Sequence, residues 1–230
     1  MDIQLYYREE GIGEPLVLLH GNGEDGSYFE HQISYFKKKY RVIAVDTRGH
    51  GKSARGTAPF TIRQFAEDLR EFLQEQGLER VNLLGFSDGG NIALIFAMRY
   101  PHMVKRLILN GANLNGKGVV PSVQIPIILG YKTASFFAKR GAKRNAEMLG
   151  LMVNDPNIAP EDLKQMHVRT LVIAGTKDMI KKEHTKLIYN NLPNAELAFV
   201  PGNHFIASKN PERFNAIVDK FLSEEDKCTM

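Results

Sequence analysis

The stretch VNLLGFSDGGNIAL, residues 81–94, joins an apolar run to a segment with helical composition. Val81–Phe86 predicts a short buried strand, residues 91–100 predict a helix, and Ser87 lies at the join. Glycines on both sides of the serine allow the backbone to turn sharply there. Taken alone, the pattern is typical either of an exposed nucleophile or of a serine that caps the helix, and both interpretations stay open at this point.

Apolar runs and amphipathic segments alternate through most of the chain. Further strands are predicted at residues 3–7 (an edge strand), 16–20, 41–46, 103–110, 168–174 and Ala195–Val200. Apolar residues at helical spacing predict helices over 61–76 and 213–222. This alternation predicts an α/β fold with a mostly parallel central sheet flanked by helices. In such sheets the chemistry gathers at the carboxyl ends of the strands.

Residues 113–162 interrupt this alternation. They contain no clear strand, several prolines and glycines, an apolar patch, and a helical pattern over about 134–152. A structureless loop of this length is uncommon inside a compact domain. We therefore predict a small helical cap at 113–162, inserted into a core formed by 1–112 and 163–230.

Two residues downstream could serve Ser87 as chemical partners. A serine hydroxyl needs a base, and the base needs a carboxylate that orients it. Behind this type of turn the expected chain order is serine, acid, histidine. Asp178 follows the strand in TLVIAGTKD, and His204 follows the next strand in PGNHF. Each alone could be an ordinary turn or loop residue, but together they predict a catalytic set of Ser87, Asp178 and His204.

An acyl-transfer site also needs N–H donors for the oxyanion. The Asp88 amide at the helix start is one candidate, and the Asn22 amide in HGNG is the other, although HGNG could be a plain flexible turn. Phe86 is a candidate substrate contact for an apolar group. The Asp88 carboxylate either faces the pocket and attracts a cationic group or only favours the first turn of the helix.

Five segments together resemble the α/β-hydrolase superfamily over nearly the whole chain. They are LVLLHGNG, VIAVDTRGHGKS, LLGFSDGG, TLVIAGTKD and PGNHF. The resemblance implies the α/β-hydrolase fold, with the cap inserted after the sixth family strand. It implies that Ser87 is the nucleophile, His204 the base and Asp178 the acid, with Asn22 and Asp88 as oxyanion donors. The chain departs from the family in its single strand before LVLLH and its short cap.

The implied function is a serine hydrolase that cleaves a small carboxylic ester through an acyl-enzyme. Alternatives are the same triad acting on another bond (a C–C hydrolase, a perhydrolase, an amide or thioester hydrolase) or a non-catalytic ligand-binding member of the fold. Epoxide hydrolases and dehalogenases are disfavoured because they carry an aspartate where this chain has Ser87. We expect no cofactor, and no metal because the chain lacks His-x-x-x-His and paired cysteines.

The composition of the chain limits which partners and which cellular compartment are expected. The chain has 43% hydrophobic and 24% charged residues and a formal charge of +4, with no basic run interleaved with aromatics, so no nucleic acid is expected. No apolar run approaches the roughly 18 residues of a membrane span, so we expect no stable membrane insertion. The start of the chain lacks a signal-peptide pattern and Cys228 has no partner for an internal disulfide. We therefore expect a cytoplasmic protein that acts on a small ester or acyl substrate. The sequence predicts no oligomeric state.

The predicted cap is basic. Six lysines and arginines and no acidic residue lie within 113–146: Lys117, Lys132, Lys139, Arg140, Lys143 and Arg144. Such a segment is typical of a solvated helix face. It could also steer anionic substrates or contact a membrane surface.

Overall fold

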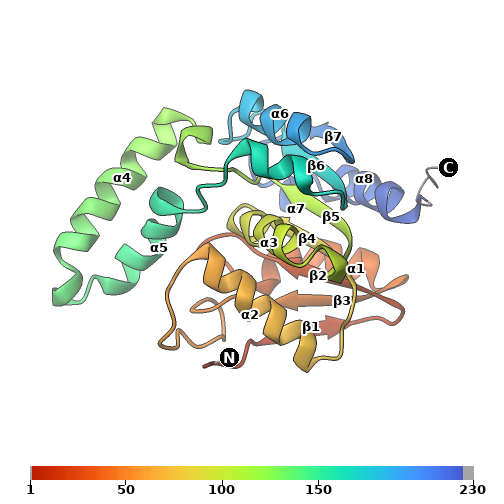
Figure 1. The fold of residues 1–230 in the computed structure, drawn as a ribbon, viewed down its shortest axis with the longest axis horizontal. Helices are drawn as coiled ribbons and strands as arrows, with labels where there is room; N and C mark the ends of the chain where they lie inside the picture. The colour runs from red at the N-terminus through yellow and green to blue at the C-terminus, as the bar shows by residue number, and fades with distance from the viewer. Residues whose placement is uncertain (1, 225–230) are drawn as a thin grey trace.

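A seven-stranded sheet forms the centre of the protein, whose computed structural model describes residues 2–224 (Figure 1). The strands are β1 (Tyr7–Glu10), β2 (Glu14–Leu19), β3 (Tyr40–Val45), β4 (Val81–Phe86), β5 (Val104–Asn110), β6 (Arg169–Gly175) and β7 (Ala195–Val200). They lie in the order β1-β3-β2-β4-β5-β6-β7, and only β1 and β3 pair antiparallel. The predicted mostly parallel sheet is confirmed, while Cys228 lies outside the described residues.

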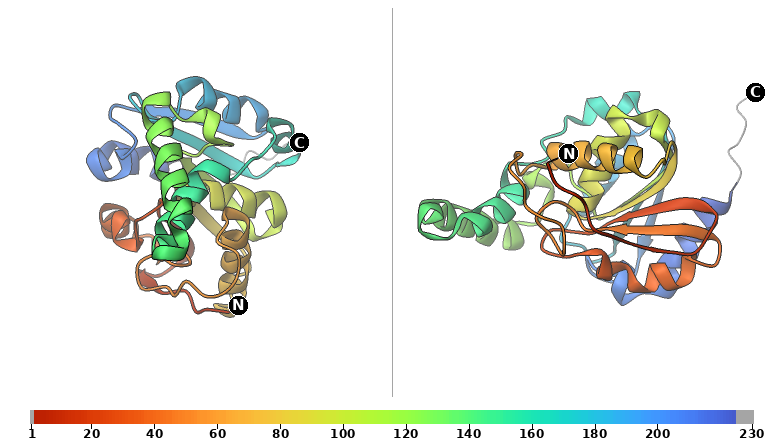
Figure 2. Two further views of the ribbon diagram at one scale, coloured as in Figure 1. Left: turned by 90° about the vertical axis from the view of Figure 1, so that its left-hand side faces the viewer. Right: turned by 90° about the horizontal axis from the view of Figure 1, so that it is seen from below.

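Helices cover both faces of the sheet (Figures 1 and 2). The helices of the main body are α1 (Glu30–Phe36), α2 (Ile62–Glu75), α3 (Asp88–Arg99), α6 (Lys182–Asn191), α7 (Ile206–Lys209) and α8 (Pro211–Ser223). Val17 and Leu19 of β2 pack in one core with α2 and α3, and Leu16 and Leu18 pack in the other with α1 and α8. Alternate residues of one strand thus feed opposite cores, as expected for a strand covered on both faces.

The helices predicted for the main body are confirmed with small shifts at their ends. The helix expected at 61–76 is α2, and the Thr61 hydroxyl caps it by accepting from Gln64 N–H. The helix expected at 213–222 is α8. The helix after Ser87 begins at Asp88, three residues earlier than predicted.

The first predicted strand is misplaced. Residues 3–7 were expected to form the edge strand, whereas β1 begins only at Tyr7. Ile3 and Leu5 are buried in the core, so the alternation of apolar and polar residues at 3–7 correctly indicates an extended segment with one buried side. Its neighbour is a loop rather than a strand, because Tyr6 N–H donates to Ser53 Oγ at 2.8 Å and its carbonyl accepts from Asp46 N–H at 2.9 Å.

The loop at 46–53 is held in place by buried polar side chains. The Asp46 carboxylate accepts backbone N–H groups on both of its oxygens. His20 accepts Thr47 N–H through Nε2 at 3.0 Å, and His50 Nδ1 lies 3.1 Å from Thr47 Oγ1. Both imidazoles are buried and hold neighbouring loops together.

Two helices occupy the segment between β5 and β6: α4 (Pro121–Phe136) and α5 (Lys143–Asn154). They pack on each other and project away from the sheet (Figure 2). The single helical pattern expected at 134–152 is wrong, because the chain turns at 137–142, where Gly141 takes φ 100°. The apolar patch before it is itself helical. Among residues 2–224, no helix is long and apolar enough to cross a membrane.

Candidate active site

Ser87 occupies a strained turn between β4 and α3, at the carboxyl edge of the sheet. Its backbone has φ 54° and ψ −120°, a conformation that costs a non-glycine residue free energy and is found mostly at functional sites. A Cβ on Gly85 would collide with the Gly89 carbonyl, and a Cβ on Gly89 would collide with the Leu19 carbonyl. The glycines are needed because strand and helix backbones approach so closely here.

The Ser87 hydroxyl does not cap the helix that follows it. Ser87 is the residue before α3, but its side chain makes no capping hydrogen bond. Its Oγ instead lies 3.0 Å from Nε2 of His204, which is 117 residues further along the chain. The interpretation of Ser87 as a helix-capping side chain is therefore wrong.

The imidazole of His204 links Ser87 to a buried carboxylate. His204 Nδ1 lies 2.6 Å from Asp178 Oδ1, and both side chains are almost inaccessible to solvent. Asp178 Oδ1 also accepts Ile180 N–H at 2.9 Å, and Oδ2 accepts Gly175 N–H at 3.2 Å. The carboxylate is thereby fixed in orientation, and it leaves Nε2 of the imidazole facing the serine. The structure thus brings together the three residues that the sequence predicted at the ends of β4, β6 and β7.

Gly111 makes room for this imidazole. Its φ is +65°, and a Cβ there would lie 2.7 Å from His204 Cε1 and 2.9 Å from Nδ1. Gly77 has nearly the same φ, +66°, with nothing within 4 Å of an added Cβ. Alanine at either position would strain the backbone, but only alanine at Gly111 would also contact His204.

We expect Gly111→Ala to lower the activity of the protein much more than Gly77→Ala. Each alanine should cost about 1–2 kcal/mol of folding free energy because of its left-handed backbone. Only Gly111→Ala displaces His204, and a displacement of the order of 1 Å at such a site costs roughly 100-fold in rate. Ester turnover and denaturant unfolding of both variants would test this. Equal losses of activity would show that the imidazole does not need the space above Gly111.

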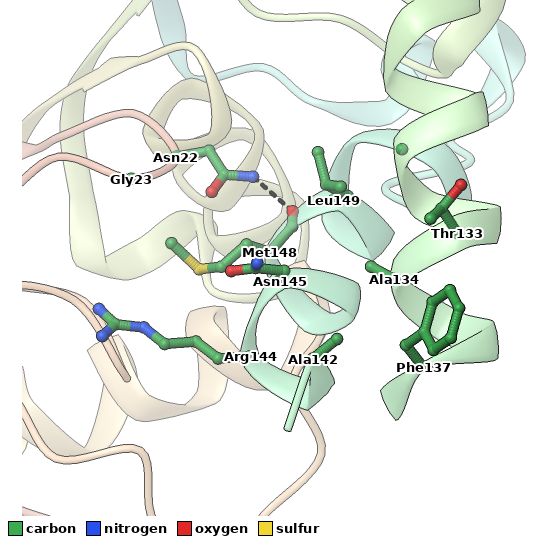
Figure 3. Close-up of a pocket in the computed structure, with 11 residues that line it drawn as sticks. Asn22, Gly23, Thr133, Ala134, Phe137, Ala142, Arg144, Asn145, Met148 and Leu149 are labelled. Carbon is green, nitrogen blue, oxygen red and sulfur yellow. Dashed lines mark hydrogen bonds between the residues drawn. The ribbon is translucent and has the colours of Figure 1, made fainter. Parts of the chain in front are cut away.

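One predicted oxyanion donor belongs to the residue after Ser87, and the other belongs to a residue that lines the same cavity as Ser87. The Asp88 amide is the first of α3, where the N–H groups lack intrahelical partners. The Asn22 amide belongs to the loop after β2. Within the described residues, neither amide donates to another protein group. The Asn22 side chain has a separate role, because its Nδ2 donates to the Met148 carbonyl of α5 at 2.7 Å (Figure 3).

Phe86 and the Asp88 carboxylate are both buried. Phe86 stacks on Tyr28 at a centroid distance of 4.3 Å and lies 4.8 Å from the His204 ring, so it also supports the imidazole. Asp88 Oδ1 lies 3.4 Å from Asn91 Nδ2, while Oδ2 has no hydrogen-bond partner among residues 2–224. Burial raises the pKa of Asp88 to about 6, against the opposing effect of the side-chain amides of Asn22 and Asn91.

Glu24 is a residue of the site that the sequence did not reveal. It lies in the wall of the cavity that contains Ser87 and His204, and its Oε2 accepts Gly21 N–H at 3.1 Å. Burial raises the pKa of Glu24 from 4.5 to about 7, although Gly21 N–H and the nearby His204 favour the charged form. In the sequence the segment HGNGED has the composition of a turn. Only the position of Glu24, three residues after Gly21, indicates that its carboxylate could accept the Gly21 N–H.

The raised pKa predicts a pH-dependent cost of ionising Glu24. Because its folded pKa lies above the unfolded value, the protonated carboxyl contributes stability that is complete below about pH 4.5 and is lost as the pH rises through about 7. Glutamine keeps an acceptor for Gly21 N–H without a charge. We expect Glu24→Gln to melt at a higher temperature than the wild type at about pH 8 and at the same temperature near pH 4.5.

Melting curves of both proteins between these pH values would test the expectation, with exposed Glu79→Gln as the matched control. A constant difference in melting temperature across the range would contradict it. So would the same pH trend in the control.

Two neighbouring cavities lie beside α5, and Ser87 lines the inner one. The inner cavity, about 170 Å³, is lined by Ser87, His204, Glu24, Phe86, Gly21, Asn22, Met148, Leu149, Met152, Met179 and Phe205. The outer cavity, about 690 Å³, lies between α4, α5 and the loop after β2 (Figure 3). Asn22, Met148 and Leu149 line both cavities. Residues 2–224 contain no cluster of three or more His, Cys, Asp or Glu side chains that could hold a metal ion.

Comparisons with known proteins agree with this architecture. The family model of the alpha/beta hydrolase fold matches residues 14–128, half of the chain. The human serine hydrolase BPHL is 27% identical, over 96% of this chain and 83% of its own length. A 2-hydroxy-6-oxononadienedioate/2-hydroxy-6-oxononatrienedioate hydrolase of Paraburkholderia phymatum is 31% identical, over 74% of this chain and 61% of its own.

A solved structure of a hydrolase from Pseudomonas aeruginosa PA01 superimposes with a TM-score of 0.79 at 26% identity, covering 96% of this chain and 95% of that one. The match therefore extends beyond the residues of the family model to nearly the whole chain. Sheet order, the turn at Ser87 and these similarities agree, and the chain belongs to the alpha/beta hydrolase fold family.

Proposed function

We propose that this protein is a serine hydrolase that cleaves a small carboxylic ester through an acyl-enzyme. The observation that carries the proposal is the continuous chain of contacts from Ser87 Oγ to His204 Nε2, 3.0 Å, and from His204 Nδ1 to Asp178 Oδ1, 2.6 Å. Serine, histidine and carboxylate in this arrangement are the parts that nucleophilic acyl transfer requires. Similarity to the human serine hydrolase supports the same chemistry.

In the first half-reaction, His204 Nε2 accepts the Ser87 proton while Oγ attacks the ester carbonyl carbon. The carbonyl oxygen becomes an oxyanion, which the Asn22 and Asp88 amides stabilise. Asp178 stabilises the imidazolium that forms. His204 then donates its proton to the leaving alcohol as the tetrahedral intermediate collapses to the acyl-enzyme.

In the second half-reaction, His204 Nε2 removes a proton from water, which attacks the acyl carbon. A second oxyanion forms at the same amides. Collapse of this intermediate returns the proton to Ser87 Oγ and releases the carboxylic acid. The acyl carbon thus exchanges its bond to Ser87 Oγ for a bond to the water oxygen, and the free enzyme is regenerated.

The lining of the inner cavity favours a small, mostly apolar acyl group. Its walls beyond the catalytic set are mainly thioether, leucine and phenyl groups, contributed by Met148, Leu149, Met152, Met179 and Phe205. Residues from α5 line both cavities, and the Asn22–Met148 hydrogen bond ties α5 to the oxyanion loop. We accordingly assign the cap role to the segment 113–162.

A second candidate is hydrolysis of a dicarboxylate by the same machinery. It is favoured by the similarity to the Paraburkholderia phymatum hydrolase, whose name specifies a dienedioate substrate. The lining of the inner cavity argues against it, because among the described residues it includes no lysine or arginine that could pair with a second carboxylate on the substrate. The neutral ester is therefore the first choice.

A fluorophosphonate probe combined with a series of p-nitrophenyl esters tests the proposal. We expect a covalent adduct on Ser87 and faster turnover of acetate and butyrate esters than of laurate ester, because the inner cavity is small. A protein without any adduct would instead be a ligand-binding member of the fold. An adduct without ester turnover would direct attention to another bond, and a dienedioate would then be the next substrate to assay.

A further inference from the structure

The outer helix of the projecting pair, α4, exposes an apolar stripe. Ile125 is 56%, Leu129 59% and Phe136 80% exposed, and their spacing of four and seven residues places them on one side of the helix. Ala134 is the only residue of α4 that is buried. A helix of a water-soluble domain normally turns its apolar side toward a core. Large apolar side chains grouped on a surface mark an interaction site.

Positive charge surrounds this stripe. Lys132 lies in the stripe itself, between Leu129 and Phe136, and Lys139 and Arg140 follow directly after α4. All three are exposed. None of them forms an ion pair with another described residue.

The charge is concentrated in this part of the chain. Residues 113–146 hold six of the 30 lysines and arginines and none of the 26 acidic residues, so the rest of the chain has 24 basic and 26 acidic residues. The protein is therefore polarised, with a basic projection on a slightly acidic body. A surface of this kind attracts a negatively charged partner.

The stripe faces away from the protein body. α4 packs on α5, which lies between α4 and the sheet (Figures 1 and 2). The outer cavity is lined by other residues of α4, Gly130, Thr133 and Ala134, together with residues of α5. The stripe therefore lines neither cavity.

We propose that Ile125, Leu129 and Phe136 with Lys132, Lys139 and Arg140, the α4 face, dock on the surface of a bilayer that contains anionic lipid. The apolar side chains enter the boundary between headgroups and acyl chains, and the cations contact the lipid phosphates and carboxylates. A helix that lies in the interface in this way needs no membrane-spanning length. A second copy of the chain is a poorer partner, because it would set two basic faces against each other.

Vesicle co-sedimentation tests the proposal on the full chain. We expect binding to vesicles of phosphatidylcholine mixed with phosphatidylserine, weaker binding to phosphatidylcholine alone, and loss of binding as salt rises. Leu129→Ser/Phe136→Ser should weaken binding about tenfold or more, because it removes the inserting groups. The triple variant Lys132→Gln/Lys139→Gln/Arg140→Gln should also weaken binding, by roughly fivefold for each cation removed.

The matched controls are exposed residues on the opposite part of the molecule. Ile12 is 86% exposed between β1 and β2, and Lys38 is exposed between α1 and β3. Ile12→Ser and Lys38→Gln should bind vesicles as the wild type does. Fluorophosphonate labelling and melting temperature report that the variants are folded, because none of the changed residues lines the cavities.

Two results would overturn the proposal. One is a folded wild-type protein that does not sediment with the phosphatidylserine vesicles at low salt. The other is an equal loss of binding in Ile12→Ser and in Leu129→Ser/Phe136→Ser. A dimer in analytical ultracentrifugation that Leu129→Ser/Phe136→Ser dissociates, without vesicle binding, would identify the second copy as the occupant and would likewise reject the lipid surface.

Discussion

Ser87→Ala is expected to reduce kcat for ester hydrolysis by about four to six orders of magnitude. The variant keeps the turn between β4 and α3, since alanine tolerates the backbone of Ser87 no worse than serine does. It loses only the nucleophile, and the Asn22 and Asp88 amides remain. The small residual rate should therefore come from binding and oxyanion stabilisation alone.

Steady-state turnover of p-nitrophenyl acetate, with labelling by a fluorophosphonate, measures this loss. Melting temperature and substrate binding should stay close to the wild type, because Ser87 Oγ contributes no helix cap. Ser223→Ala, at the exposed end of α8, is the matched control and should retain full activity and labelling. Retained turnover in Ser87→Ala would reject the acyl-enzyme.

Asp178→Asn is expected to reduce kcat by about three to four orders of magnitude at neutral pH. The carboxylate accepts three hydrogen bonds, from His204 Nδ1, Ile180 N–H and Gly175 N–H. An asparagine NH₂ must replace one of the two accepting oxygens. If it faces the imidazole, it donates to Nδ1 and leaves the proton on Nε2, where it blocks the base function toward Ser87.

The other orientation of the asparagine is also unfavourable. Its NH₂ would then oppose the Gly175 N–H, so that a buried donor is left without an acceptor at a cost of about 1–3 kcal/mol. Turnover at neutral pH and the rate of fluorophosphonate labelling measure the effect on chemistry, and thermal unfolding measures the structural cost. Exposed Asp162→Asn is the control. A loss of less than tenfold would mean that Asp178 does not orient His204.

Much of the fold was predictable because it rests on local patterns. Residues 16–19 of β2 form a continuous apolar run, and α2 shows helical spacing between recognisable ends. Strand–helix alternation then determines a mostly parallel sheet, whose carboxyl edge collects Ser87, Asp178 and His204. Chain order was sufficient to pair these three residues.

The errors arose where a segment's partner is distant in sequence or missing. Residues 3–7 alternate like a strand, but they bind a loop that begins about forty positions later, and β1 follows them. The apolar first half of α4 shows no single apolar face, because α4 packs on α5 with one side and exposes apolar residues on the other. Glu24 was missed because its burial depends on α5 and on the end of β7, which no pattern around HGNGED contains.

The sequence by itself determined that this chain builds an alpha/beta hydrolase sheet with a serine at the sharp turn after β4. Glycines, apolar runs and the order of three polar residues are local facts, and they suffice for that. Only the tertiary structure decided what the Ser87 hydroxyl contacts, because a cap and a nucleophile have the same neighbours in the chain. The contact with His204 Nε2 comes from β7 packing beside β6, 117 residues away. Likewise, only packing decided that Glu24 joins the site and that the apolar side of α4 faces outward.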